Sequence, residues 1–204
     1  MSNSKKFYRG LGGRIIEKLP SGYKFFRSAL EWRKRVDNSY NIIAIHGNNT
    51  YSPHVGISFS FGKKYDDIEI IEKLMGCKYF RTHIQVGTSV LSNKPQFPYL
   101  GPSYWNINIE NPPENLEVEI MWLIEGLGFP FFNQFPTVED ARNEMQKTKR
   151  TWCKGFHWMQ YFHIKAVLDE MDEFVEWSQR LDPFQKDLAD KYIEKYISLS
   201  ATNL

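Results

Sequence analysis

The chain has 204 residues, of which 42% are hydrophobic and 16% aromatic, so it can build one sizeable core without disulfide staples. Its 26 basic and 24 acidic residues leave a net charge of +2, too small a field to attract nucleic acid or an anionic membrane. Neither an apolar signal core at the N-terminus nor a run of 18 apolar residues is present, and the two cysteines do not form a disulfide framework. We therefore expect a cytoplasmic protein with no membrane partner.

The first predicted element is a helix over residues 4–19. Apolar residues recur there at every fourth position: Phe7, Leu11, Ile15 and Leu19. Its glycines weaken this prediction, because each costs about 1 kcal/mol in a helix interior. Residues 20–22, Pro-Ser-Gly, end the helix, and residues 23–36 then read as one bent strand or two short ones.

Strands dominate the next part of the chain. Residues 42–45 form an apolar run suited to a buried strand, and residues 54–61 alternate strictly between large apolar and small side chains. The face of small residues predicts either a second packed element or a solvated surface. Alternation returns over residues 79–90 and 104–110. Between these strands, Asp66 and Asp67 are positioned to cap a short helix that ends at Gly76.

The second half reads as helical. Residues 114–125 follow two prolines and carry an inner stripe of Leu116, Ile120, Met121 and Ile124. Further helices are predicted over residues 137–149, over 155–181 with a kink, and after Asp182. Strands first and helices last predict an α+β fold: a mostly antiparallel sheet with an N-terminal helix and a C-terminal group of helices packed on it. We expect one domain, 1–204, with a strand-rich part (20–110) and a helical part (112–204).

The histidines offer the clearest metal hypothesis. His157 and His163 are six residues apart, which places them on different sides of a helix. His46, His54 and His83 lie on or near predicted strands and could converge, with Asp66 or Asp67 as a further ligand. Separately hydrogen-bonded histidines are the alternative, so no metal site is assigned.

No catalytic set emerges from the remaining reactive residues. Cys153 and His157 have the spacing of a helical pair, but they lie where a helix begins, and no oxyanion donor accompanies them. A phosphate-binding loop and a Gly-x-Ser-x-Gly elbow are both missing from the sequence. We therefore assign no catalytic residue and no cofactor.

Two aromatic segments are candidate binding surfaces. Phe97, Tyr99 and Tyr104 belong to a proline-stiffened stretch whose rings would lose little entropy on binding, or would instead fold over the sheet. Trp152 and Trp158 belong to a second aromatic cluster and are its members expected to be exposed.

Charged clusters add to these surfaces. Asp169, Glu170, Asp172 and Glu173 form an acidic run, and Glu114, Glu117 and Glu119 form another. Such a run is typical of a solvated helix face, and it could also dock a basic partner. A basic stretch at Arg27 and 33–35, with Phe26 and Trp32 interleaved, resembles a small nucleic-acid surface, but acidic residues interrupt it, so nucleic acid is not the expected partner.

Three segments carry a resemblance to a known family: residues 22–27 with the strand block ending at 54–59, residues 104–107, and residues 128–132 with 137–139. Across roughly residues 20–140 the chain resembles an uncharacterised bacterial family, the domain of unknown function numbered four-three-zero-four, some of whose members lie near polymorphic toxin genes. The resemblance implies an immunity role, in which a cognate toxin or effector protein is neutralised by direct binding. An enzyme with a His/carboxylate site on the sheet and a nucleic-acid-binding regulatory module are the alternatives.

Overall fold

The computed structural model describes residues 2–51, 53–76, 82–91, 97, 99–147 and 158–202. Two compact units are present: Met1–Lys64 with Ile84–Pro136, here called the sheet unit, and Tyr65–His83 with Thr137–Leu204, called the helical unit. The sequence led us to expect one domain with a helical part beginning at residue 112. In the structure, residues 65–83 belong with the C-terminal helices and are inserted between two strands of the sheet.

The sheet unit is built on six strands, and each pairing given by register is antiparallel, as the sequence predicted. The strands are β1 (Tyr23–Phe26), β2 (Glu31–Val36), β3 (Ser39–Tyr51), β4 (His54–Tyr65), β5 (Ile84–Gly87) and β6 (Tyr104–Asn108). They run in the order β1-β2-β3-β4-β5, and β6 pairs with the first half of β4 while β5 pairs with its second half. The segment expected to be one bent strand or two is thus the β1–β2 hairpin.

The aromatic core of the sheet unit lies on one face of the sheet, while Glu31, Ile42 and Ala44 are buried on the other face. The large residues of β4 that alternate in the sequence, Val55 to Phe61, are buried on the aromatic face. Trp32 joins them: its ring stacks on Phe59, and its Nε1 donates a 3.0 Å hydrogen bond to the carbonyl of Gly12. Trp32 is therefore a core residue and is not part of an exposed aromatic platform.

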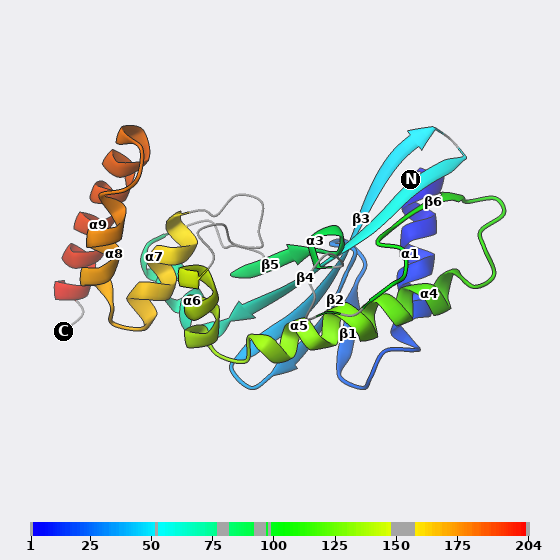
Figure 1. Ribbon diagram of the computed structural model, residues 1–204, viewed down its shortest axis with the longest axis horizontal. Helices are drawn as coiled ribbons and strands as arrows, with labels where there is room; N and C mark the ends of the chain where they lie inside the picture. Colours follow the sequence, from blue (N-terminus) through cyan, green and yellow to red (C-terminus); the bar gives the residue numbers. More distant parts are fainter. Residues whose placement is uncertain are drawn as a thin grey trace. The chain divides into compact units, whose positions relative to one another are not determined.

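Helices cover the aromatic face. They are α1 (Asn3–Ile16), α4 (Leu116–Leu123), the π-helical turn η1 (Ile124–Gly128) and α5 (Phe129–Gln134), with the short α3 (Thr88–Leu91) after β5. Figure 1 shows α1 alongside the long β3–β4 hairpin. The glycine at position 12 of α1 is required by packing, because a Cβ there would overlap the Phe25 ring. The backbone of α1 thereby approaches the sheet closely.

The helical unit contains α2 (Asp66–Leu74), α6 (Val138–Lys147), α7 (Trp158–Val167), α8 (Met171–Ser178) and α9 (Pro183–Thr202). Thr137 and Asp140 form the expected reciprocal cap of α6, and Asp182 accepts hydrogen bonds from the first backbone amides of α9. The expected cap of α2 is wrong, since Asp66 is already helical and follows the N-cap residue Tyr65. The predicted kinked helix is two helices, separated at Asp169 by a φ of 56°.

Aromatic side chains fill the core of the helical unit. Phe162 of α7 is fully buried, and it meets rings of both C-terminal helices edge-on: Phe174 of α8, and Tyr192 and Tyr196 of α9. Edge-to-face pairs of this kind add to the free energy gained from burial. Within the part of the chain that the structure describes, no helix is both long and apolar enough to cross a membrane.

Candidate protein-binding site

The outer face of α4 carries two exposed apolar side chains. Its inner residues, Leu116 and Ile120, are buried as the sequence predicted, and they fix the helix against the sheet unit. Val118 and Trp122 lie one turn apart on the opposite side and are 44% and 62% exposed. Most of the indole therefore lies in water on a helix whose position is set by buried contacts, an arrangement suited to an interface anchor.

Carboxylates flank this pair at both ends. Glu114 lies in the turn just before α4, four residues before Val118, and Glu125 lies in η1, three residues after Trp122; both are exposed. Neither has an ion-pair partner among the described residues. We call Glu114, Val118, Trp122 and Glu125 the α4 face.

The two glutamates within α4 itself have partners inside the sheet unit. Glu117 pairs with Arg14 and Lys18 of α1, and hydrogen bonding to Arg14 holds the pKa of its carboxyl below the usual range. Glu119 accepts hydrogen bonds from Trp105 at 2.8 Å and from Asn115 at 2.6 Å. Of the acidic residues that the sequence singled out here, Glu114 is thus the one left facing solvent without a described partner.

Residues 99–103 lie at the far end of the α4 face. The Tyr99 side chain packs on the backbone of Gly126, one turn beyond Trp122, and its hydroxyl donates to the carbonyl of Pro102. Burial, with a smaller contribution from Glu119, raises the pKa of Tyr99 to about 12. Tyr99 is therefore an anchor within the unit, and it presents the fully exposed Leu100 beside the helix.

Tyr104 lies on the opposite face of the sheet from α4. Its neighbour Trp105 points toward Glu119, so alternation along β6 directs Tyr104 the other way. The ring leans across Gly56 and remains half exposed. Tyr104 is thus accessible as predicted, but it is not part of the α4 face.

Two of the predicted aromatic anchors are buried. Phe97 is 1% exposed and Trp158 is 7% exposed, because their rings serve the cores of their units. The Trp158 ring meets Tyr192 edge-on at 5.5 Å between centroids. Neither ring can reach a partner from these positions, which corrects the prediction that both are binding residues. Trp152, like the predicted pair of Cys153 and His157, lies outside the described residues.

The acidic run at the start of α8 is largely a structural element. The Lys165 side chain is fully buried, and its Nζ lies 2.7 Å from a Glu170 oxygen and also contacts Glu173. Glu170 additionally pairs with Arg142 of α6. Only Asp169 and Asp172 remain exposed without a described ion-pair partner, so the run offers a partner much less charge than its sequence suggests.

The pKa values of this cluster follow from those contacts. Burial alone would lower the pKa of Lys165, but hydrogen bonds to Glu170 and Glu173 outweigh it and hold the pKa above its usual value. Burial would likewise raise the pKa of Glu170, and hydrogen bonds from Lys165 and Arg142 outweigh it and hold that pKa low. Both groups are therefore kept charged.

The basic stretch of β2 is divided between the two faces of the sheet. Arg33 lies over the Phe26 ring and pairs with the buried Glu31, which neutralises its charge. Lys34 points to the opposite face, over the Tyr23 ring. A continuous basic surface for nucleic acid is therefore not formed by this stretch.

The three strand histidines have separate surroundings. His46 is exposed, and its Nε2 lies 2.6 Å from the Ser60 hydroxyl, which also accepts a 2.8 Å hydrogen bond from the Gln85 amide. His83 is buried in the helical unit, where its Nδ1 accepts from the backbone N–H of Tyr65 and its Nε2 lies 3.2 Å from Glu72. No group of three His, Cys, Asp or Glu residues that could hold a metal occurs among the described residues.

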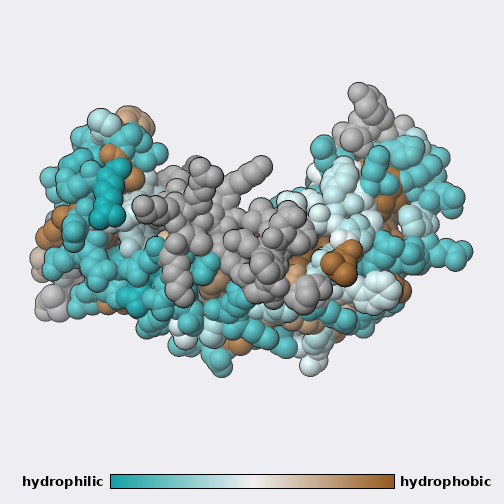
Figure 2. Space-filling view, in the orientation of Figure 1, coloured by the Kyte–Doolittle hydropathy of each residue, from teal (hydrophilic) through white to brown (hydrophobic). Residues whose placement is uncertain are grey.

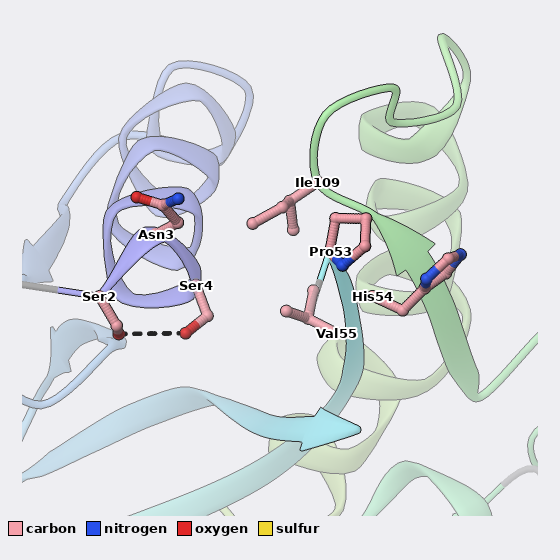
Figure 3. A pocket seen from close by; sticks show the side chains of 7 residues that line it. All are labelled: Ser2, Asn3, Ser4, Pro53, His54, Val55 and Ile109. Atoms are coloured by element: carbon pink, nitrogen blue, oxygen red, sulfur yellow. Dashed lines mark hydrogen bonds between the residues drawn. The ribbon is translucent and has the colours of Figure 1, made fainter. Parts of the chain in front are cut away.

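His54 borders a small cavity of about 260 Å³. The cavity is lined by Ser2, Asn3, Ser4, Pro53, His54, Val55 and Ile109. Figure 3 shows the Val55 side chain directed toward the start of α1, where the Ser2 and Ser4 hydroxyls are 3.1 Å apart, and the His54 ring directed away on the other side of the strand. The imidazole is therefore not placed to act on a molecule in this cavity.

Figure 2 shows a mainly hydrophilic surface in that view, with hydrophobic residues scattered in small groups. No family model, no curated protein and no solved structure matches the chain. The residues of the α4 face must therefore be interpreted on their own chemistry.

Sequence reasoning missed Trp122, although the sequence held a signal for it. A stripe of Leu116, Ile120, Met121 and Ile124 defines the inner side of α4. Val118 and Trp122 lie outside that stripe at a spacing of four, so helical geometry alone would have placed both apolar residues on the outer side. An apolar pair on the side of a helix that faces away from the core indicates a candidate binding surface.

Proposed function

We propose that this chain is a protein-binding protein that acts in the cytoplasm and neutralises a bacterial toxin or effector by direct contact. The observation that supports this function best is the exposed Trp122 on a rigidly seated helix. Tryptophan is enriched among residues that dominate binding energy, and a preorganised helix loses little entropy when it binds. The flanking carboxylates would steer a basic partner, such as a nuclease toxin, toward this face.

Co-expression tests this function directly. The protein encoded beside this gene is produced in a host, and growth and complex formation are compared with and without this chain. We expect the chain to restore growth and to co-purify with its neighbour. Trp122→Ala should weaken the complex by about 2 kcal/mol, or about 30-fold in Kd, since truncating a central anchor costs this much.

The matched control is Ile70→Ala on α2, which removes an equally exposed apolar side chain elsewhere. It should leave both growth and Kd unchanged. Absence of any complex with the neighbouring gene product, or equal effects of the two substitutions, would argue against neutralisation through the α4 face.

The His46–Ser60 contact favours a second candidate function, an esterase-like activity. Because Ser60 accepts a hydrogen bond from Gln85, its hydroxyl hydrogen is available to His46 Nε2. A nucleophile within hydrogen-bond reach of a base is the minimum for acyl transfer. Ser60 Oγ would attack an ester carbonyl carbon as its proton passes to His46, and that proton would leave with the alcohol as the ester C–O bond breaks. Water, giving a proton to His46, would then attack the acyl group on Ser60, and that proton would return to Oγ as the acid is released.

A fluorophosphonate probe distinguishes this alternative. Labelling would form an Oγ–P bond at Ser60 and release fluoride, with the proton taken up by His46, and intact mass spectrometry would register one adduct. The adduct should be lost in Ser60→Ala and in His46→Ala but kept in Ser58→Ala. A chain that remains unlabelled would leave His46 and Ser60 as a structural cross-strand pair.

A further inference from the structure

We infer that the α4 face recognises a basic segment of its partner that carries a large apolar side chain between its cations. This inference rests on the proposed protein-binding function and adds the chemistry of the segment bound. It follows from two properties of the α4 face, the apolar pair at its centre and the exposed carboxylates at its ends, which have no ion-pair partner in the described part of the chain.

The apolar pair defines where the partner's own anchor would sit. Val118 and Trp122 are neighbours on the helix surface, and the fully exposed Leu100 follows Tyr99, whose ring packs on Gly126 beyond Trp122. Removing such side chains from water is favourable by about 25 cal/mol for each Å² buried. A polar segment would offset this gain by the cost of burying its own hydrogen-bonding groups, so the segment we infer presents an apolar side chain of its own.

The charges define what surrounds that anchor. Glu114 and Glu125 lie on either side of the apolar pair, and neither has an ion-pair partner among the described residues. The nearby cations Arg14 and Lys18 are bound to Glu117. A partner cation on each side would therefore meet a free carboxylate, whereas an acidic segment would be repelled at both ends.

A second copy of this chain fits the face less well. Two copies apposed through this face would bring four carboxylates around one apolar contact, with no cation of the α4 face to compensate them. Like charges placed opposite each other across an interface oppose association. The occupant we infer is thus a different, basic polypeptide.

Selection from a peptide library tests the inference without knowledge of the natural partner. Random peptides of about 16 residues, long enough for a helix or extended segment to span the face, are displayed on phage and selected on the full chain. We expect the selected peptides to be rich in Lys and Arg around an aromatic or large aliphatic residue. Synthetic versions should bind with a Kd that rises with salt, since exposed charges are screened.

Variants then assign the binding to this face. Trp122→Ala should weaken the selected peptides by about tenfold or more. The double variant Glu114→Gln with Glu125→Gln keeps the tryptophan and should weaken binding severalfold while removing most of its salt dependence. Phe184→Ala and Glu176→Gln, exposed residues of α9 and α8, are the matched controls and should change neither value.

Several results would overturn the inference: no selected peptide, neutral or acidic peptides, or basic peptides whose binding survives Trp122→Ala. Its failure is distinguishable from failure of the proposed function. If co-expression does not restore growth while basic peptides bind through Trp122, the proposed toxin neutralisation is rejected and the inferred recognition of a basic, apolar segment is kept. If rescue occurs but depends on neither Trp122 nor the two glutamates, the function stands and this assignment falls.

Discussion

Two acidic regions of this chain have the same kind of composition and opposite roles. Around α8, Glu170 and Glu173 both bind the ammonium of the buried Lys165, and that region is held together by charge. Around α4, buried apolar residues hold the helix, and Glu114 and Glu125 are left to face solvent. The difference shows that a buried cation, and not the number of acidic residues, decides whether an acidic cluster is available to a partner.

Lys165→Ala should cause the largest loss of stability, because it removes the cation that holds the acidic cluster around α8 together. The substitution removes a fully buried side chain together with the cation that Glu170 and Glu173 share, and it leaves Glu170 paired with Arg142 alone. We expect it to lower the free energy of unfolding by about 3 kcal/mol. Urea denaturation measures this value. Lys191→Ala removes a surface pair with Asp187 and should leave the midpoint unchanged. Equal effects of the two variants would mean that the buried cluster does not hold this region.

Gly128→Ala tests how the region around α4 is held against the sheet. A Cβ at Gly128 would lie 2.6 Å from the Phe61 ring, so η1 would have to move away from the sheet. We expect a loss of about 2 kcal/mol in thermal or urea unfolding. Gly13→Ala, where a Cβ meets nothing within 4 Å, should instead stabilise α1 by about 0.5 kcal/mol. An equal loss of stability in both variants would contradict close packing of η1 against Phe61.

Glu170→Gln tests, through the pH dependence of stability, whether the charge of this carboxylate stabilises the fold. Since the folded pKa of Glu170 lies below its usual 4.5, this carboxylate stabilises the fold above pH 4.5 and loses that contribution as the pH falls through the folded pKa. The variant lacks the contribution, so its stability should fall less steeply on the acid side. Unfolding free energies measured between neutral and acidic pH test this, with Glu176→Gln as the control that retains the wild-type slope.

Glu125→Gln should have the smallest effect on stability. The carboxylate is exposed and has no ion-pair partner within the described ranges, so the unfolding midpoint should match that of the unmodified chain. A clear loss of stability would show that Glu125 has a structural role, as Glu170 does. The contrast between these two glutamates would then disappear.

Periodicity predicted most of the fold. The α+β class, the antiparallel sheet and the alternation of β4 are confirmed, since large residues at every second position can only be buried on one face. The caps at Thr137 and Asp182 are confirmed as well, because local hydrogen bonding fixes them. The grouping of residues 65–83 with the C-terminal helices was not predictable, since contacts between distant segments leave no local pattern.

The candidate site was harder to predict. In the sequence, Phe97 and Trp158 cannot be distinguished from exposed aromatic anchors. The packing of the folded chain shows that both are buried. The pairing of Lys165 with Glu170 depends on the break in the chain at Asp169, whose left-handed backbone the sequence did not indicate. Exposure of Trp122, by contrast, followed from helical geometry and could have been predicted.

The insertion of residues 65–83 into the sheet unit also has a consequence for synthesis on the ribosome. α2 emerges early, yet α7, the helix that it contacts, is made only after the sheet unit is complete. Until then Ile68, buried in the finished protein, lacks its cover. A nascent chain stalled near residue 136 would thus display an apolar helix surface, which is the kind of feature that chaperones bind.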